Sequence, residues 1–236
     1  MIRGLLVFGF VPLYMLLASL VGYPIARVLG SPALLYTLGR FGVRVGLRLA
    51  GTKVVLEGRE KLGDPANTVV MANHVSFLDA PLLFEAFGID FKAVVKKEIF
   101  RFPFFGACLR FAGFIEVDRA DRAQSTAAIG RAAESLRKGA CFLIFPEGTR
   151  TQSGELGEFR KGAFVVAIDA GSRIVPVALS GLRERLPRGG FRISPGVVHV
   201  KVLDPFDAGS YSYDERDRLI AEVRGRIAGA LAGEDS

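Results

Sequence analysis

The distribution of apolar and polar residues divides the chain into two parts, of which the first begins with a long apolar segment. Residues 4–26 contain no charged side chain and are rich in Leu, Val and Phe. A helix of this length reaches across the hydrocarbon core of a bilayer, and the run is too long for the core of a cleaved signal peptide. Pro12 and Pro24 weaken a straight spanning helix but permit a kinked or re-entrant one. The pattern therefore predicts a membrane-associated helix.

A second helix is predicted after a break at Gly30. Ser31 suits the N-cap position and Pro32 the first helical position, and the helix is expected to stop at Gly51. Its apolar residues share one face of the helix. The two segments together predict a membrane-associated helical pair over residues 1–51.

Three arginines, Arg40, Arg44 and Arg48, recur every four residues on another face of this second helix. A basic amphipathic helix beside an apolar segment is typical of a membrane interface, with the arginines among the lipid phosphates. An ordinary helix with a solvated charged face is the alternative. Only Arg3 precedes the apolar segment, whereas these arginines follow it. If the segment spans a membrane, this asymmetry predicts that the rest of the chain is cytoplasmic.

After Gly51 the pattern changes to apolar runs that alternate with segments of helical periodicity. Candidate strands cover residues 53–57, 68–72, 91–95, 114–117, 141–145, 174–179 and 197–203. Candidate helices cover residues 79–87, 104–111, 122–137, 162–170 and 214–231, and a Gly/Pro/Arg-rich loop covers residues 183–192. The alternation predicts an α/β domain over residues 52–236, with a mixed sheet of about seven strands covered by helices.

The composition favours a lipid surface over nucleic acid as the partner of this basic chain. Lys and Arg number 31 against 24 Asp and Glu, which gives a net charge of +7. Such a charge suits either nucleic acid or anionic lipid. Half of the residues are hydrophobic, however, and the sequence contains neither zinc-finger spacing nor a basic helix with base-reading Asn or Gln. We therefore expect a membrane surface as the partner and no nucleic acid.

Cysteine and histidine are scarce, which limits the chemistry of the chain. Cys108 and Cys141 lie far apart and form no C-x-x-C motif, so no disulfide framework is expected. This cysteine usage is consistent with a reducing compartment. The two histidines, His74 and His199, have no companions at metal-ligand spacing, so no metal site is predicted. His199 alternates with valines, which indicates a strand residue without a chemical role.

One histidine lies where a predicted strand turns into a predicted helix. The strand over residues 68–72 is followed by Asn73, a common turn residue, and Asp79 and Pro81 begin the helix. Across such a turn Asp79 is able to bind the Nδ1–H of His74 and leave Nε2 free as a general base. A lone His–Asp pair is more often structural. A second polar stretch over residues 145–150 follows another apolar strand, and this favours a site at the strand ends.

Four stretches resemble, in the same order, the motifs of the glycerolipid acyltransferases, which make phosphatidic acid from lysophosphatidic acid. They are NHVSFLD (73–79), GFIEVDR (113–119), FPEGTR (145–150) and VPVA (175–178). The resemblance implies transfer of a fatty acyl group from a thioester of acyl carrier protein or coenzyme A to the sn-2 hydroxyl of lysophosphatidic acid, without a cofactor. It also implies a location at the cell inner membrane, with the catalytic domain facing the cytoplasm.

The resemblance also implies roles for individual residues. His74 and Asp79 are the catalytic pair, and His74 is expected to deprotonate the acceptor hydroxyl, which attacks the thioester directly because no G-x-S-x-G nucleophile motif occurs. The candidate substrate-binding residues are Lys97, Arg119, Glu147, Gly148, Thr149 and Arg150. Lys97 and Arg119 offer cations for a phosphate monoester. Glu147 offers an acceptor for a glycerol hydroxyl or a partner that orients Arg119 or Arg150.

Other functions stay open at this point. The acceptor could be another lysophospholipid or glycerol-3-phosphate, because the motifs do not choose among these acceptors. A catalytically inactive membrane protein that binds lipid would explain the basic helix but not the His74–Asp79 pair. A nucleotide enzyme is disfavoured because the sequence contains neither G-x4-G-K-[ST] nor G-x-G-x-x-G.

Overall fold

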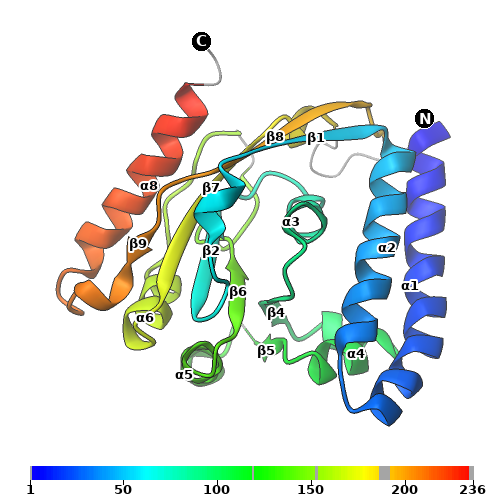
Figure 1. Ribbon diagram of the computed structural model, residues 1–236, viewed down its shortest axis with the longest axis horizontal. Helices are drawn as coiled ribbons and strands as arrows, with labels where there is room; N and C mark the ends of the chain where they lie inside the picture. The colour runs from blue at the N-terminus through cyan, green and yellow to red at the C-terminus, as the bar shows by residue number, and fades with distance from the viewer. Residues whose placement is uncertain (1, 119, 152–153, 186–191, 234–236) are drawn as a thin grey trace.

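The computed structural model describes residues 2–118, 120–151, 154–185 and 192–233. Figure 1 shows a sheet with helices on both faces and two long helices, α1 and α2, side by side at one end. The helices are α1 (Ile2–Leu29), α2 (Ala33–Ala50), α3 (Asp79–Phe87), α4 (Phe105–Phe111), α5 (Arg122–Arg137), α6 (Lys161–Asp169), α7 (Leu182–Arg185) and α8 (Arg216–Ala232), with short 3₁₀ turns η1 (Arg59–Leu62), η2 (Ile99–Arg101) and η3 (Ala208–Ser210). The strands are β1 (Thr52–Glu57), β2 (Thr68–Ala72), β3 (Phe91–Lys92), β4 (Val94–Lys96), β5 (Ile115–Val117), β6 (Cys141–Ile144), β7 (Arg173–Ser180), β8 (Gly196–Val202) and β9 (Phe206–Asp207).

The main sheet has seven strands in the order β1-β8-β7-β2-β6-β3, and β9 pairs with β7 beside this path. Strands β7, β2, β6 and β3 are parallel, whereas β8 runs antiparallel to β7. The predicted α/β fold with a mixed sheet of about seven strands is confirmed. Because β2, β6 and β7 are parallel neighbours, their carboxyl ends lie at one edge of the sheet, and the segments that follow them meet there.

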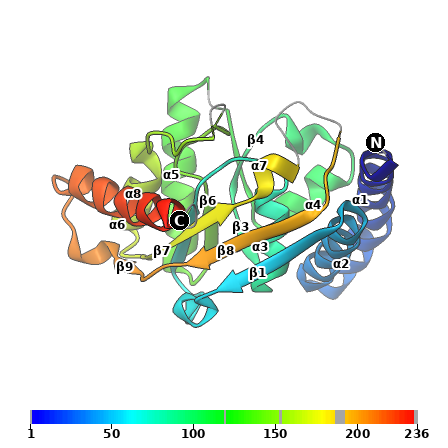
Figure 2. The same cartoon turned by 90° about the horizontal axis from the view of Figure 1, so that it is seen from above.

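The core consists of two apolar layers, one on each face of the sheet. Along β2, Val69 and Met71 pack into one layer, and Val70 and Ala72 pack into the other. Helices α5, α6 and α8 cover the first face and α3 covers the second, as Figures 1 and 2 show. A parallel strand buried on both faces reads as a continuous apolar run, which explains why β2 was predicted with its observed bounds.

Three local predictions were wrong. The run at 91–95 is two strands, because Phe91–Lys92 pairs with β6 while Val94–Lys96 leaves the sheet and pairs with β5. The N-cap residue of α2 is Pro32, one residue later than the predicted Ser31. The Ser31 hydroxyl nevertheless accepts a hydrogen bond from the Ala33 N–H at 3.3 Å. The predicted loop at 183–192 begins within helix α7, and its residues 186–191 lie outside the described part of the chain.

Helix α1 exposes most of its apolar side chains. It is the one helix among the described residues that is long and apolar enough to cross a membrane, and few of its residues are buried. Its buried face packs on α2 through close contacts at glycine: a Cβ at Gly42 would lie 2.3 Å from Cε1 of Tyr14. The Tyr14 hydroxyl donates to the Leu38 carbonyl at 2.8 Å. The predicted helical pair is present, and its boundary with the α/β domain at residue 51 stays a prediction.

The arginine face of α2 lies against the α/β domain. Arg40 forms an ion pair with Asp90 and Arg44 forms one with Glu85, each at 2.5 Å. The prediction that these arginines lie among lipid phosphates is therefore wrong for Arg40 and Arg44. The reason is that α2 packs beside α3, where Leu47 joins the same apolar layer as α3. This packing brings Arg44 to Glu85 of α3 and Arg40 to Asp90 between α3 and β3.

Candidate active site

His74 and Asp79 form a hydrogen-bonded pair at the carboxyl edge of the sheet. His74 lies two residues beyond β2 and Asp79 is the first residue of α3. The His74 Nδ1 and Asp79 Oδ2 atoms are 2.7 Å apart, the Asp79 side chain is fully buried, and the His74 side chain is 22% exposed. The turn therefore gives the geometry that the sequence predicts: the carboxylate fixes the ring, and the opposite nitrogen, Nε2, remains available to an incoming hydroxyl.

The Asp79 carboxylate is held by the loop that it organises. Besides the His74 ring, Oδ2 accepts the main-chain N–H groups of Val75 at 2.7 Å and Ser76 at 2.8 Å. Its other oxygen, Oδ1, is buried and has no hydrogen bond from the described residues. Three donors on one oxygen stabilise the negative charge of the carboxylate, which in turn stabilises a positive charge on the His74 imidazole.

Phe145, the residue after β6, fixes the plane of the His74 imidazole. The two ring centroids are 4.1 Å apart and the ring planes differ by 16°, so the rings are stacked. Rotation of the imidazole would break this stacking and the bond to Asp79 together. This contact could not be predicted from the sequence, because Phe145 reads as the last apolar residue of a strand.

Glu147 joins the third motif to the first. One carboxylate oxygen accepts the main-chain N–H of His74 at 2.7 Å, and the other accepts that of Gly157 at 3.0 Å. The side chain is buried, and burial raises the pKa of the Glu147 carboxyl, while the two N–H donors act in the opposite direction. Both oxygens thus bind the protein main chain. The sequence predicted an acceptor-binding or arginine-orienting role for this residue, which stays a prediction, and the main-chain bond additionally ties Glu147 to His74.

Two further contacts tie the third motif to this support. The Thr151 N–H donates to the His74 carbonyl at 2.9 Å, which fixes the main chain of His74 from a second side. Gly148 has φ +72°, and a Cβ there would lie 2.7 Å from the Cδ and Nε atoms of Arg160. Only glycine fits this turn without displacing Arg160, whose Nε donates to the Glu147 carbonyl at 3.3 Å.

Asn73 holds the end of β2 against the end of β7. Its side-chain amide donates to the Leu179 carbonyl at 2.9 Å and accepts the Leu179 N–H at 2.7 Å. This pair of bonds continues the β2–β7 ladder through a side chain, so the residue before His74 is fixed to a neighbouring strand. The sequence identified Asn73 only as a turn residue, and a contact over more than a hundred positions leaves no local signal.

The predicted phosphate ligands have different surroundings. Lys97 forms an ion pair with Asp118. The hydrogen bond between them raises the pKa of the Lys97 ammonium and lowers the pKa of the Asp118 carboxyl. Arg119 lies outside the described residues. Thr149 is exposed, and the guanidinium carbon of Arg150 lies 3.3 Å from the centroid of the exposed Phe77 ring. Because Phe77 belongs to the loop between His74 and Asp79, this contact places Arg150 beside that loop.

The cysteines do not offer a nucleophile. Burial raises the pKa of the Cys108 thiol to about 11 and that of the Cys141 thiol to about 12, so both are protonated at neutral pH. Cys141 begins β6 and therefore lies at the edge of the sheet opposite to His74, which follows the end of the parallel strand β2. Among the described residues, no group of three or more His, Cys, Asp or Glu side chains is placed to hold a metal ion.

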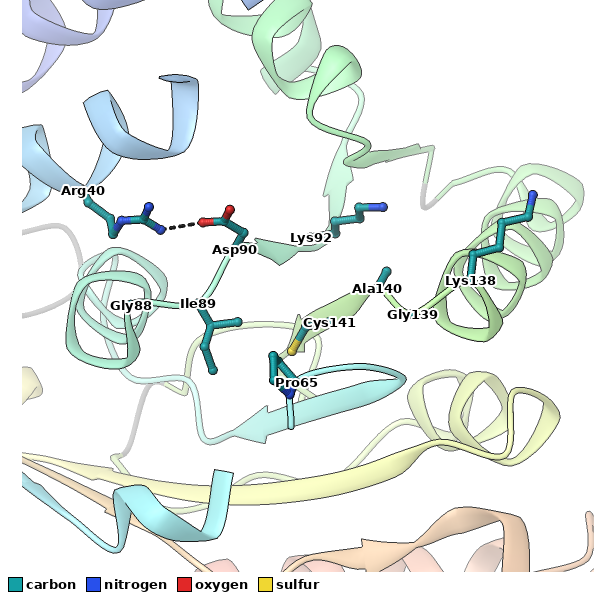
Figure 3. Close-up of a pocket in the computed structure, with 10 residues that line it drawn as sticks. All are labelled: Arg40, Pro65, Gly88, Ile89, Asp90, Lys92, Lys138, Gly139, Ala140 and Cys141. Atoms are coloured by element: carbon teal, nitrogen blue, oxygen red, sulfur yellow. Dashed lines mark hydrogen bonds and ion pairs between the residues drawn. The ribbon is translucent and has the colours of Figure 1, made fainter. Parts of the chain in front are cut away.

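A pocket of about 570 Å³ lies at that opposite edge and is not part of the His74 site. Figure 3 shows its lining, which includes Asp90 before β3 and Cys141 at the start of β6. Its Arg40 is paired with Asp90, and its Lys92 ammonium donates to the Ser135 hydroxyl at 3.1 Å. The pocket is thus away from His74, and its three cations, Arg40, Lys92 and Lys138, all have partners.

The fold and the site define an α/β protein with a hydrogen-bonded His–Asp pair at the carboxyl edge of its sheet, and comparison with known proteins identifies its family. Residues 53–180 match the model of the Acyltransferase family. The chain therefore belongs to the acyltransferase family.

Relatives and a solved structure agree with this assignment. The 1-acyl-sn-glycerol-3-phosphate acyltransferase of Arabidopsis thaliana chloroplasts is 35% identical over 181 residues, which cover 76% of this chain and 49% of that protein. A protein of the same name from Pseudomonas aeruginosa is 30% identical, with coverage of 79% and 70%. The crystal structure of the 1-acyl-sn-glycerophosphate acyltransferase PlsC from Thermotoga maritima superimposes with a TM-score of 0.78 at 25% identity, covering 96% of this chain and 95% of that one. The chain thus spans about half the length of the chloroplast relative.

Proposed function

We propose that the protein transfers a fatty acyl group from an acyl thioester to the sn-2 hydroxyl of lysophosphatidic acid, giving phosphatidic acid. The observation that carries the proposal is the 2.7 Å bond between His74 Nδ1 and Asp79 Oδ2 at the carboxyl edge of the sheet. The acceptor is taken from the relatives, which are 1-acyl-sn-glycerol-3-phosphate acyltransferases. The donor is a thioester of acyl carrier protein or coenzyme A.

The reaction needs one base and no acyl-enzyme. His74 Nε2 takes the proton of the acceptor hydroxyl, whose oxygen attacks the thioester carbonyl and forms a tetrahedral oxyanion. The oxyanion collapses, the C–S bond breaks, and the thiolate leaves with the proton returned by His74. Asp79 stabilises the imidazolium between these two steps. Direct attack is supported by the high pKa values of both buried thiols, which leave no thiolate at neutral pH.

In this proposal Glu147 is a positioning residue. Its carboxylate binds the main-chain N–H of His74 at 2.7 Å and that of Gly157 at 3.0 Å, and it is buried away from solvent. The cations Lys97, Arg119 and Arg150 are the candidates for the phosphate of the acceptor. Gly148 and Thr149 belong to the same turn as Arg150, and in this proposal the turn binds the acceptor.

The predicted phosphate ligand Arg119 offers a direct test of the acceptor. A phosphate monoester carries close to two negative charges at neutral pH, and loss of a charge-assisted hydrogen bond to it costs about 1.5–3 kcal/mol. We expect Arg119→Ala to raise the acceptor KM roughly 10- to 100-fold and to leave the donor KM nearly unchanged. Arg119→Lys should restore part of the affinity, because it keeps the charge but loses the planar fork. A rise in the donor KM alone would remove Arg119 from the phosphate site.

The proposal as a whole is tested by a panel of acceptors. Purified protein in vesicles is supplied with acyl carrier protein or coenzyme A thioesters and with lysophosphatidic acid, lysophosphatidylcholine or glycerol-3-phosphate. Lysophosphatidic acid is expected to give the highest kcat/KM. A higher kcat/KM with another acceptor would reassign the substrate. Absence of transfer with every pair of donor and acceptor would favour the alternative of a catalytically inactive protein that binds lipid.

Membrane association follows from the same proposal. The acceptor is a lipid, and the exposed apolar side chains of α1 suit the hydrocarbon core of a bilayer. We propose that residues 1–51 attach the protein to the inner membrane and that the α/β domain over residues 52–236 faces the cytoplasm. The single charged residue before the apolar segment, Arg3, supports this orientation.

A further inference from the structure

The turn between η2 and α4 presents two aromatic rings to solvent. Phe102 is 60% exposed and Phe104 is 43% exposed. The preceding Arg101 is exposed as well, and so is Lys96 at the end of β4. Exposed aromatic rings with cations beside them are typical of segments that lie in the interface of an anionic bilayer.

The main chain of this turn holds the rings outward. Phe104 has φ 57° and ψ −48°, and the Phe105 N–H donates to the Pro103 carbonyl at 2.6 Å, which is the geometry of a classic γ-turn. A residue other than glycine rarely adopts this conformation, and such strain gathers where a segment serves a function. The exposure of the rings is thus built into the backbone.

Gly106 makes the turn possible. A Cβ at this position would lie 2.1 Å from the Phe100 carbonyl oxygen, so η2 and the first turn of α4 approach as closely as only glycine allows. The Gly106 N–H donates to the Phe102 carbonyl at 2.9 Å and locks this approach. The aromatic turn is therefore a fixed feature of the fold and not a loose loop.

Helix α4, which begins directly after the aromatic turn, lies beside the apolar helix α1. At the other end of α4, Phe111 makes an edge-to-face contact with Tyr23 of α1 at a centroid distance of 6.3 Å. The guanidinium carbon of Arg27, also on α1, lies 5.3 Å from the centroid of the Phe111 ring. Figures 1 and 2 agree that α4 is next to the helical pair. A membrane that covers α1 would thus lie against the segment that carries the aromatic turn.

We propose that Phe102 and Phe104 form a second membrane contact that inserts into the boundary between headgroups and acyl chains beside α1. The inference rests on the proposed function, which makes a membrane lipid the acceptor. Lys97, a candidate phosphate ligand, lies only five residues before Phe102. The aromatic turn would thus hold the bilayer surface near this candidate ligand.

Tryptophan fluorescence tests this contact cleanly because the chain contains no tryptophan. Three single-tryptophan variants of the full chain are compared: Phe102→Trp in the aromatic turn, Leu17→Trp on the exposed face of α1, and Tyr213→Trp. Tyr213 is 60% exposed and lies three residues before α8, the helix at the end of the molecule opposite to α1 in Figure 1. The probe is phosphatidylcholine–phosphatidylglycerol vesicles with brominated acyl chains. We expect quenching and a blue shift for Phe102→Trp and Leu17→Trp, and neither for Tyr213→Trp.

The outcomes separate this inference from the proposed function. Quenching of Leu17→Trp without quenching of Phe102→Trp would overturn the second contact and leave membrane attachment through α1. Absence of quenching in both would contradict membrane attachment itself. A response of Phe102→Trp to acyl carrier protein but not to vesicles would show that the turn binds the donor, and it would also overturn the inference.

Two substitutions that remove the aromatic rings test the effect of the membrane contact on activity. Phe102→Ser removes one ring, and Phe104→Gly removes the other while suiting the positive φ of the turn. Because burial of a Phe ring contributes roughly 1.5–3 kcal/mol, loss of two rings should weaken vesicle binding by at least about tenfold. Its activity should fall on vesicle-borne acceptor but not on detergent-dispersed acceptor. Equal losses in both, or none in either, would contradict the proposal, and Tyr213→Ser is the matched control.

Discussion

Replacement of His74 by alanine is expected to reduce the rate of acyl transfer by about 10²–10⁴-fold. The imidazole is held by Asp79 at 2.7 Å and by stacking on Phe145, and in the proposed mechanism it is the general base. The chain has just one other histidine, His199, which lies on β8. Removal of the ring leaves the acceptor hydroxyl protonated, so the attack on the thioester is slowed.

The effect should be confined to the chemical step. Initial rates at saturating substrate, measured for His74→Ala and for the matched control His199→Ala, provide the comparison. His199 is exposed on the surface of β8, so its replacement should leave the rate unchanged. Both variants should keep the melting temperature of the wild type to within a few degrees. Retention of more than about a tenth of the wild-type rate by His74→Ala would exclude the residue as the base.

Replacement of Glu147 by glutamine should lower kcat and change the acceptor KM little. Glutamine keeps one acceptor oxygen but places an NH₂ group against the second main-chain N–H, so either His74 or Gly157 loses its buried partner. A hydrogen bond to a charged group contributes about 1.5–3 kcal/mol, so kcat is expected to fall roughly 10- to 100-fold if that energy holds His74 in place.

The division between kcat and KM distinguishes support from substrate binding. If Glu147 bound the acceptor directly, the acceptor KM would rise with the loss of the carboxylate. Glu158→Gln is the matched control, because Glu158 is exposed on the segment that follows Gly157. Melting curves for both variants separate a local loss of His74 geometry from global unfolding. A rise in the acceptor KM without a fall in kcat would show that Glu147 binds the acceptor, as its sequence motif suggested.

The sequence predicted the elements whose signals are local. Strand β2 is a short apolar run buried on both faces, and helix α3 begins with an acid and a proline, so both were predicted with their observed bounds. The His74–Asp79 pair belongs to the same class, because only four residues separate the two side chains and the turn between β2 and α3 brings them together. Helix α5 was placed correctly because Gly139, with φ 87°, ends it.

Features that depend on distant contacts could not be predicted in the same way. The bond between Glu147 and the His74 main chain joins residues 73 positions apart, and the amide pair of Asn73 joins β2 to β7 across 106 positions. The arginine face of α2 is a similar case. Its spacing suits lipid phosphates and carboxylates equally, and only the packing of α2 on α3 brings Arg40 and Arg44 to Asp90 and Glu85.

The central claim, direct transfer by the His74–Asp79 pair without an acyl-enzyme, is tested most directly with a labelled acyl thioester. The protein in vesicles is first incubated with the thioester alone, quenched in acid and examined for labelled protein, and lysophosphatidic acid is then added to a parallel sample. The account predicts no stoichiometric label on the protein and rapid appearance of labelled phosphatidic acid once the acceptor is present. Stoichiometric labelling of the protein, followed by transfer of that label to the acceptor, would contradict it.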